Sequence, residues 1–221
     1  MNTDCERLSM MTGDTTLQLS DFTSATIGSV VPAPSVFDPG LHPLFTPLHM
    51  AGPAFPVAID PGHNLAVHLA LAEVPKGVVL VIATGADRSR AVIGDLMALA
   101  AKGRGIAGII TDGAIRDSRA IRELGVPVLY GGISIRAMAK EQPGRVNEPI
   151  GLCGVTVNPG DVIVADEDGA VVLEPGRMEE AVNAARRREE READVRRGLR
   201  QGRTTVELLG LQSPQPPGGN P

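Results

Sequence analysis

The chain of 221 residues is 43% hydrophobic but only 2% aromatic, so its core must be built from aliphatic side chains. A net charge of −5, a pI near 5.4 and the lack of Trp argue against a nucleic-acid partner, which needs a basic surface and stacking rings. No apolar stretch approaches the ~20 residues of a membrane span and no apolar signal core begins the chain, so we expect a cytoplasmic protein without a membrane partner.

The first third of the chain predicts two helices and one strand between irregular segments. Residues 1–18 are expected to form a mobile leader before a single domain that spans residues 19–211. Leu19–Val31 predicts a helix with Ser20 or Asp21 as its N-cap, because these side chains can accept a hydrogen bond from a free N–H of the first turn. A Pro- and Gly-rich loop, a strand and a short helix are predicted next, at Val31–Pro53, Phe55–Ile59 and Asn64–Glu73.

The four histidines, at positions 42, 49, 63 and 68, show no zinc-ligand pairing. His63 and His68 are five residues apart and therefore face different sides of a helix. We expect surface or structural positions for all four.

The centre of the chain predicts a β-α-β unit. Val78–Thr84 is a β-branched apolar run with the length of a buried strand, and Ile106–Ile110 is a second one. Asp95–Lys102 predicts a helix between them, and two glycines suit its C-terminal exit. Asp112-Gly113 predicts a turn after the second strand. Such a unit normally makes parallel strands joined by a crossover helix.

The geometry of this unit brings polar residues to one edge of the sheet. The helix start presents free backbone N–H groups and a positive dipole end, and the loop after the second strand returns to the same edge. Arg116 and Asp117 can therefore converge on Asp95. A guanidinium offers a planar fork to a carboxylate, and a neighbouring carboxylate offers a hard oxygen ligand to a divalent cation. These residues predict a small site for an anion beside a metal; an ordinary surface Arg-Asp pair is the alternative.

The second half of the chain begins with a helix, a strand, a loop and a β-meander, predicted at Ser118–Leu124, Val126–Tyr130, Gly131–Pro149 and Gly154–Glu174. The turns of the meander are predicted at Pro159-Gly160 and Asp168-Gly169. Arg136, Lys140 and Arg145 lie in the loop, where we expect their side chains to be solvated.

Arg177–Gln201 predicts a long helix in which Arg and Glu form many i,i+4 pairs and apolar residues are sparse. Such a helix is either solvated or lies across a partner subunit. Residues 212–221 are rich in Pro and Gly and predict a disordered tail.

The spacing D-x20-R-D, from Asp95 to Arg116-Asp117, strongly resembles the divalent-metal-dependent 4-hydroxy-4-methyl-2-oxoglutarate aldolases, a family that includes the regulator of ribonuclease activity A (RraA). The resemblance covers roughly residues 24–210. The segments that carry it, in order, are S-A-T-I-G from residue 24, M-A-G-P-A-F from 50, P-G-H-N-L-A from 61, R-G-I-A-G-I-I-T-D-G-A-I-R-D from 104 and G-V-T-V-N-P-G-D from 154.

The resemblance implies an α/β fold of the swivelling-domain type, an αββα sandwich that assembles into trimers, sometimes paired into hexamers. The predicted β-α-β unit followed by a β-meander agrees with that fold. No G-x-G-x-x-G follows a predicted strand, as a dinucleotide-binding Rossmann sheet would require.

The resemblance also implies a class II pyruvate aldolase. Asp117 would bind one Mg²⁺ or Mn²⁺, and Arg116 would pair with the carboxylate or the developing oxyanion of a 2-oxo acid. The substrate carboxylate would be held by backbone N–H groups at the helix start, those of Gly94, Asp95, Leu96 and Met97.

Two further carboxylates complete the implied mechanism. Asp95 would position a water that moves protons, together with a glutamate from the long helix of a neighbouring subunit. That glutamate corresponds to Glu192, with Glu189 and Glu190 as alternatives. The same site would decarboxylate oxaloacetate as a side activity.

Two other functions remain open from the sequence. One is a non-catalytic regulator like RraA, which binds an RNA-processing nuclease through its surface. The other is methyl transfer to demethylmenaquinone, which ranks last because no glycine-rich loop for adenosylmethionine is visible.

Overall fold

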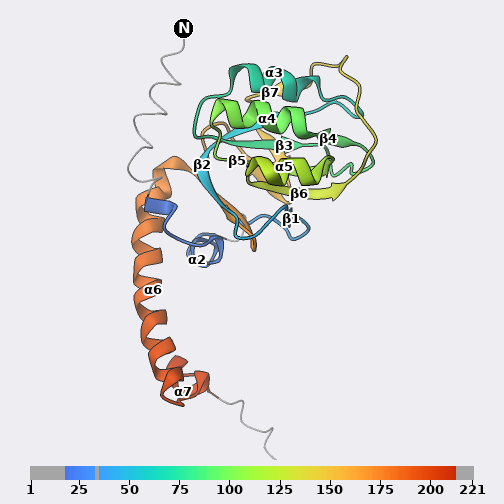
Figure 1. Ribbon diagram of the computed structural model, residues 1–221. Helices are drawn as coiled ribbons and strands as arrows, with labels where there is room; N and C mark the ends of the chain where they lie inside the picture. Colours follow the sequence, from blue (N-terminus) through green and yellow to red (C-terminus); the bar gives the residue numbers. More distant parts are fainter. Residues whose placement is uncertain (1–17, 33–34, 213–221) are drawn as a thin grey trace, which may run out of the picture.

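The computed structural model describes residues 18–32 and 35–212, and its elements are labelled as in Figure 1. The predicted leader and tail therefore lie almost wholly outside the described residues. Among the helices of this described part, none has the length and apolar character needed to cross a membrane.

A mixed sheet bends around its longest strand, β2 (His49–Ala58). The first half of β2, from His49 to Pro53, pairs antiparallel with β10, and the second half, from Ala54 to Ala58, pairs parallel with β3. The order is β1-β6-β5-β3-β2-β10-β11, with β4 beside β5 and β7 beside β2, while β8 and β9 form a separate hairpin. The other strands are β1 (His42–Pro43), β3 (Val79–Ala83), β4 (Ala91–Ile93), β5 (Gly108–Ile115), β6 (Val128–Ile133), β7 (Arg145–Val146), β8 (Ile150–Leu152), β9 (Val155–Val157), β10 (Val162–Asp166) and β11 (Gly169–Leu173).

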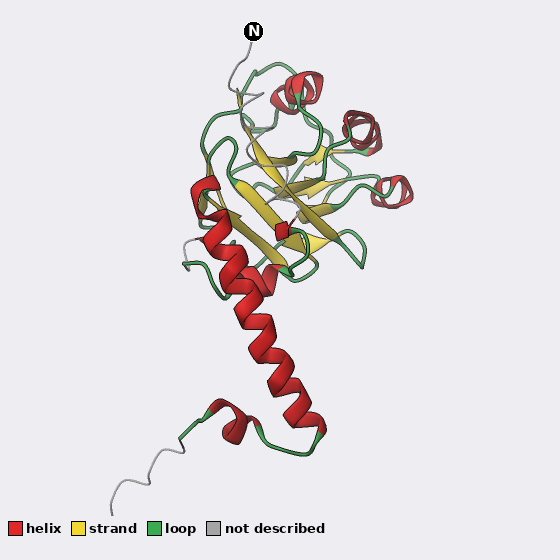
Figure 2. Cartoon of the chain, turned by 90° about the vertical axis from the view of Figure 1, so that its left-hand side faces the viewer, coloured by secondary structure: helices red, strands yellow, loops and turns green. Residues whose placement is uncertain are grey.

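The bend produces four layers. Three helices cover one face of β3 and β5, and α2 and α6 pack on the outer face of β10 and β11 (Figures 1 and 2). Aliphatic side chains fill the space between the two halves of the sheet, for example Val81 and Ile110 against Ile163 and Val172. The predicted αββα arrangement is thus confirmed. The helices are α2 (Ser24–Gly28), α3 (Leu65–Glu73), α4 (Asp95–Arg104), α5 (Ser118–Leu124), α6 (Met178–Arg200) and α7 (Thr205–Leu209).

Several elements end where the sequence predicts. α5 has its predicted bounds and stops at Gly125, whose φ of 71° is a left-handed exit. α4 runs two residues past Lys102 and stops at Gly105, with φ 68°. α6 lies one residue inside each end of its predicted range.

The predicted turn at Asp112-Gly113 is wrong, because both residues lie inside β5, which is buried throughout. The Asp112 carboxylate accepts hydrogen bonds from the N–H and Oγ of Thr84 (2.7 and 2.9 Å) and from the N–H of Ala86 (2.7 Å). Asp112 thus fixes the loop that separates β3 from β4. A Cβ at Gly113 would lie 2.5 Å from Thr84 Cγ2, so this close approach requires glycine.

The first predicted helix is also wrong in its bounds. The described helix α2 begins at Ser24, and its N-cap is Thr23, whose Oγ1 accepts from the Thr26 N–H at 3.1 Å. Ser24 donates from its backbone N–H and its hydroxyl to the buried Asp166 carboxylate, at 2.7 and 2.5 Å. This anchor lies 142 residues away in sequence, and the local sequence could not reveal it.

Other differences concern strands placed in predicted loops. β1 and the first half of β2 fall within the loop predicted at Val31–Pro53, and β7 falls within Gly131–Pro149. In place of a continuous meander, β9 pairs with β8, and β10 pairs with β11 and β2. The sequence did not predict β4 or α7.

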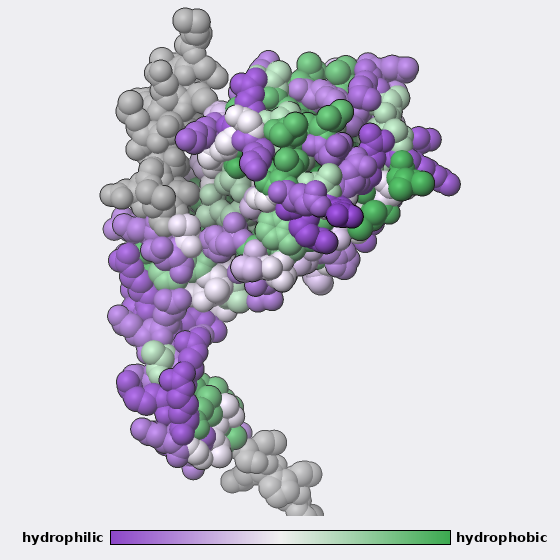
Figure 3. Space-filling view, viewed as in Figure 1, coloured by the Kyte–Doolittle hydropathy of each residue, from purple (hydrophilic) through white to green (hydrophobic). Residues whose placement is uncertain are grey.

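Helices α6 and α7, residues 178–209, form an arm that extends away from the sheets (Figures 1 and 2). Buried residues of α6 lie mostly in its first two turns: Met178, Ala181, Val182 and Ala185. The rest of α6 is mainly hydrophilic, with apolar side chains at the far end of the arm (Figure 3). The exposed apolar residues there are Leu199, Val206 and Leu209, and Leu211 follows just after α7.

Candidate active site

The two ends of the D-x20-R-D spacing meet because β4 and β5 are parallel neighbours. Ile93 at the end of β4 is paired with Ile115 at the end of β5. The Arg116 N–H donates to the Ile93 carbonyl oxygen at 2.9 Å, so the chain that leaves β5 stays beside the chain that leaves β4. The twenty residues between Asp95 and Arg116 form the rest of α4, a short connection and β5, which returns the chain to the same edge of the sheet. The structure therefore brings Asp95, Arg116 and Asp117 together.

Gly94 permits this approach. A Cβ at Gly94 would lie 2.7 Å from Asp117 Oδ2 and 3.0 Å from Arg116 Nε. Real Cβ contacts are longer, so any side chain here would displace both functional groups. The glycine is thus part of the geometry of the site.

Arg116 and Asp117 form a half-exposed pair. Arg116 Nε lies 3.3 Å from Asp117 Oδ2, and the side chains are 42% and 41% exposed. The Asp95 N–H also approaches Asp117 Oδ2, at 3.4 Å. An exposed ion pair contributes only about 0–1 kcal/mol to stability. Asp117 also takes a left-handed backbone conformation, with φ 55°, which is unfavourable for a non-glycine residue. Stability therefore does not explain the ion pair or the left-handed backbone of Asp117. Both features place the Asp117 carboxylate beside Arg116 and the start of α4.

The start of α4 supplies further hydrogen-bond donors. Its N-cap, Gly94, has no side chain to bind the first N–H groups, and the first intrahelical bond is Ala98 N–H to the Gly94 carbonyl at 3.0 Å. Within the described part of the chain, the N–H groups of Leu96 and Met97 have no protein partner. A helix start of this kind attracts an anion.

A pocket of about 130 Å³ opens beside these groups. Its walls come from β4, the first turn of α4, α3 and the segment after β6. Backbone hydrogen bonds hold that segment in place: the Asn64 N–H donates to Ala139 O and the Ala139 N–H donates to Gly62 O, both at 2.9 Å. The lining residues are Asn64, His68, Ala91, Val92, Ile93, Gly94, Asp95, Leu96, Met97, Arg116, Ala137, Met138 and Lys140.

Three polar residues of the pocket have no role in the sequence-based prediction of the site: Asn64, His68 and Lys140. Asn64 is 6% exposed, and its Nδ2 donates to Val92 O at 3.0 Å. Its Oδ1 and the Nε2 of His68 are buried and have no hydrogen-bond partner among the described residues. Burial and then the charge of Lys140 lower the pKa of His68. Only the P-G-H-N-L-A segment of the resemblance, which contains Asn64, could have drawn attention to this wall.

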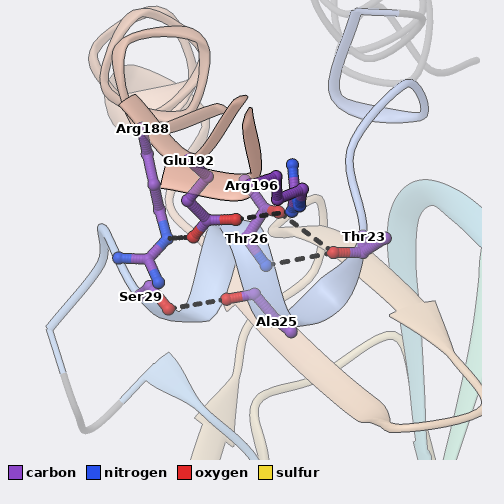
Figure 4. Close-up of polar contacts among 7 residues, drawn as sticks. All are labelled: Thr23, Ala25, Thr26, Ser29, Arg188, Glu192 and Arg196. Carbon is purple, nitrogen blue, oxygen red and sulfur yellow. Dashed lines mark hydrogen bonds and ion pairs between the residues drawn. The ribbon is translucent and has the colours of Figure 1, made fainter. Parts of the chain in front are cut away.

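Glu192 lies elsewhere in the chain. It sits in α6 between Arg188 (2.9 Å) and Arg196 (2.7 Å), above α2 (Figure 4). The pocket is on the other side of the sheets, under α3 and α4. Glu189 and Glu190 are exposed on the same helix. None of these three glutamates reaches the site within one chain.

The residues of the site fit a hard, hydrated cation. No group of three or more His, Cys, Asp or Glu side chains that could hold a metal occurs among the described residues. Asp117 Oδ2 faces Arg116, and Oδ1 has no protein partner in the described part of the chain. A carboxylate oxygen without a protein partner, on a side chain that is 41% exposed, suits Mg²⁺ or Mn²⁺, which keep several waters when bound.

The family is identified by comparison with known proteins. An RraA-like family model, described as Aldolase/RraA, matches residues 18–172. A Halalkalibacterium halodurans protein provisionally named 4-hydroxy-4-methyl-2-oxoglutarate aldolase is 40% identical over 149 residues, which cover 67% of this chain and 71% of that protein. A Thermus thermophilus protein named 4-hydroxy-4-methyl-2-oxoglutarate aldolase is 36% identical over 110 residues, 50% of this chain and 67% of that one.

A solved structure agrees with this result. The crystal structure of Streptomyces coelicolor RraAS2, described as an unusual member of the RNase ES inhibitor RraA protein family, matches with a TM-score of 0.77 and 31% identity. The match covers 83% of this chain and 96% of that one. The chain therefore belongs to the Aldolase/RraA family.

Proposed function

We propose that this protein cleaves a 4-hydroxy-2-oxo acid, similar to 4-hydroxy-4-methyl-2-oxoglutarate, into pyruvate and a second oxo compound. Oxaloacetate decarboxylation is proposed as a side activity of the same site. The observation that carries the proposal is the meeting of Asp95, Arg116 and Asp117 at an uncapped helix start beside a pocket. The names of the two aldolase relatives support the same reaction class.

The 2-oxo acid end of the substrate would bind at the start of α4. The N–H groups of Leu96 and Met97 would donate to its carboxylate, and Arg116 would place its fork beside the carboxylate or the 2-oxo oxygen. Asp117 would hold Mg²⁺ or Mn²⁺. When bound, such a cation supplies a Lewis acid that stabilises negative charge on the 2-oxo oxygen.

The bond changes follow from this orientation. The 4-hydroxyl loses its proton to a water held by Asp95, the C3–C4 electron pair moves toward C3 and the 2-oxo oxygen, and C4 becomes a carbonyl carbon. Arg116 stabilises the charge that develops on that oxygen. C3 then takes a proton from the water at Asp95 and becomes the methyl group of pyruvate. In oxaloacetate the same electron movement releases carbon dioxide, and no base is needed at the start.

We also propose that the site is completed by a second copy of the chain, in a trimer or a pair of trimers. Most of α6 beyond Ala185 is not buried against its own sheets, and the arm ends in exposed apolar residues. An arm placed across a neighbour would cover these residues and would bring Glu192 to the neighbour's site, where it would help Asp95 to hold the water.

The direct test is a pyruvate-release screen with 4-hydroxy-2-oxo acids and oxaloacetate, after chelation and after return of Mg²⁺ or Mn²⁺. We expect release with at least one hydroxy acid that stops on chelation and returns with metal. Glu123→Ala is a matched control, because Glu123 is an exposed carboxylate of α5 that pairs with Arg119. Metal-independent release, or no release from any compound, would reject the proposal.

A second candidate is a regulator that binds a ribonuclease. The description of RraAS2 as a member of an RNase ES inhibitor family favours it. Recovery of a ribonuclease in a pull-down, with no turnover of any oxo acid, would replace the aldolase proposal with this one.

A further inference from the structure

An exposed ridge follows the carboxyl end of β6. We call it the arginine ridge, and it consists of residues 87–90 and 133–137. Ile133 and Ile135 are 60% and 90% exposed, and no other large apolar side chain of the described residues is as exposed as Ile135. Ser134 Oγ donates to Ser89 O at 2.7 Å, so the two segments are tied together. Single apolar side chains are ordinary on a surface, but two on a fixed backbone indicate a contact surface.

Positive charge surrounds the two isoleucines of the ridge. Arg88 and Arg90 donate to backbone carbonyl oxygens, at 3.3 and 2.8 Å. Neither of them, nor Arg136, forms an ion pair with a carboxylate among the described residues. Together with Asp87, the ridge has three positive charges and one negative charge, an excess of two. In a chain with a net charge of −5, this excess marks the ridge as a surface for an acidic partner.

A hollow of the opposite character lies at the start of α6, and we call it the acidic hollow. Its volume is about 50 Å³, and since one water needs roughly 10–15 Å³, it has room for several carbon atoms. Buried or half-buried apolar side chains line its floor: Val30, Val31, Leu173 and Ala181. The exposed side chains at its rim are Glu174, Arg177 and Glu180. Arg177 pairs with Glu180 at 3.6 Å, which leaves the Glu174 carboxylate without a basic partner among the described residues.

The ridge and the hollow lie at opposite ends of the sheets. Leu173, at the end of β11, pairs with Val162, which pairs in turn with Pro53 in the middle of β2. β3 begins to pair with β2 one residue later, so the hollow lies level with the amino ends of the parallel strands. The ridge follows their carboxyl ends, where Ile133 pairs with Ile115. Figure 1 shows α6 starting on one side of the sheets and β6 ending on the other. The two surfaces therefore cannot meet within one chain.

We propose that the arginine ridge of one copy of the chain binds the acidic hollow of a second copy, with Ile135 in the hollow and Arg136 facing Glu174. The most exposed apolar side chain then gains an apolar floor, and the excess positive charge meets an unpaired carboxylate. Because two different surfaces meet, the contact is head-to-tail and can close into a ring of copies. This inference rests on the proposed assembly with a second copy, and it adds which surfaces meet.

The contact places the arm of one copy beside the candidate site of the next. α6 begins at the hollow. The ridge adjoins the site, because Ile133 pairs with Ile115, the residue before Arg116. Glu192 lies twelve residues beyond Glu180 in α6, which is about 18 Å of helix. The same contact thus gives the arm a route toward the neighbour's site.

The experiment measures, by sedimentation equilibrium, the concentration at which the assembled full-length chain dissociates. Ile135→Asp, Arg136→Glu and Glu174→Arg should each raise this concentration by about tenfold or more, because like charges then face each other or an acid enters the apolar hollow. The double variant of Arg136→Glu with Glu174→Arg should recover most of the loss, since the two charges only exchange sides. Arg119→Glu and Glu123→Arg are matched controls, because both residues are exposed on α5.

The outcomes separate this inference from the proposed function. Recovery in the double variant would support the contact and exclude misfolding as the cause of the single losses, and no recovery would reject the pairing of Arg136 with Glu174. Wild-type assembly of all three single variants would reject the contact alone, while the pyruvate-release screen still decides the aldolase proposal. A wild-type chain that stays monomeric would reject the contact together with the proposed assembly. If only Glu174→Arg weakens assembly, another segment such as residues 1–17 occupies the hollow, and the contact is rejected.

Discussion

Between Ala91 and Leu124 the chain packs so closely that a methyl group at Gly94 would displace the functional side chains, whereas the arm between Met178 and Leu209 exposes most of its side chains. Paired strand ends fix the first region, which we call the site region. Pairs such as Arg188 with Glu192, four residues apart, support the arm and contribute only about 0.2–0.5 kcal/mol each. The site region thus positions its residues within one chain, whereas most side chains of the arm have no such packing to position them.

The largest expected effect is at Asp117. Asp117→Ala and Asp117→Asn should abolish metal-dependent pyruvate release, by about 10³-fold or more, because Lewis-acid stabilisation is worth several kcal/mol. The fold should survive, since the Asp117 side chain makes no capping bond to α5 and is 41% exposed. Asn tolerates the left-handed backbone at this position better than Ala does.

Kinetics with and without added Mg²⁺ would check this prediction, and Glu123→Ala on the same helix should behave like wild type. A wild-type rate for Asp117→Asn at saturating metal would show that the carboxylate is not the ligand.

The next effect concerns the guanidinium. Arg116→Lys removes the planar fork but keeps the charge, and loss of such a contact costs roughly 2–5 kcal/mol, or about 10–10³-fold in rate. Arg119→Lys is the matched control, because Arg119 is an exposed arginine of α5 that pairs with Glu123. If both lysine variants kept normal kcat/KM, charge alone would be sufficient at position 116.

The close packing of the site region can be tested at Gly94. The atoms that an added methyl would meet are the ends of the Asp117 and Arg116 side chains, which can move. Gly94→Ala should therefore fold, yet lose about 10²-fold in activity, the size of effect expected from a displacement of about 1 Å. Gly103→Ala is the control, since Gly103 lies in α4 with open space around it, and it should raise stability by about 0.5–1 kcal/mol. Full activity of Gly94→Ala would show that the approach of Asp117 is not required.

The sequence predicted elements that depend on local signals and failed where a residue has distant partners. α5 and α6 were predicted almost to the residue because their signals are local: a glycine exit at Gly125 and opposite charges four residues apart. Asp112-Gly113 was misread as a turn because its partners, Thr84 and Ala86, belong to another strand end. Only tertiary structure places them together.

The candidate site also has a part that the sequence predicted and a part that it did not. The β-α-β pattern and the motif predicted that Asp95, Arg116 and Asp117 meet, but the strand that leads into the helix is β4, which the sequence did not predict, and not β3. The Asn64 and His68 wall could not be predicted, because it depends on how α3 and the segment after β6 pack beside β4. The sequence of Leu65–Glu73 indicates a helix but does not show which elements pack beside it.

The arm's proposed contact with a second chain gives the next prediction. Asp117→Ala and Glu192→Ala subunits should each be inactive alone, and mixing them should restore part of the activity, because some interfaces then combine an intact Asp117 with an intact Glu192. Glu189→Ala and Glu190→Ala, changes at exposed positions of the same helix, decide which glutamate is needed. An active monomer in sedimentation, or no recovery on mixing, would contradict a shared site.

The smallest expected effect is an opposite response to acid of two carboxyls, Asp161 beside β10 and Glu207 in the arm. Burial raises the pKa of the Asp161 carboxyl, even though the Asn158 N–H donates to it at 2.8 Å. In the arm, the Thr204 N–H donates to Glu207 at 3.0 Å and lowers the pKa of that carboxyl. The two groups should therefore make contributions to stability that change in opposite directions with pH.

The signs follow from proton linkage. Folded Asp161 has a raised pKa, so its contribution is fully present below its ordinary value of 3.8 and is lost as the pH rises through the folded value. Folded Glu207 has a lowered pKa, so its contribution is present above 4.5 and is lost as the pH falls through the folded value. In urea unfolding, Asp161→Asn should gain stability relative to wild type as the pH rises. Hydrogen exchange of the Thr204 amide can report on Glu207 separately, since the end of the arm can open without unfolding of the sheets. Glu207→Gln should protect this amide less than the wild type does, and the difference should be largest near neutral pH. If the differences from wild type in unfolding free energy (Asp161→Asn) and in Thr204 protection (Glu207→Gln) did not change with pH, both pKa shifts would be rejected.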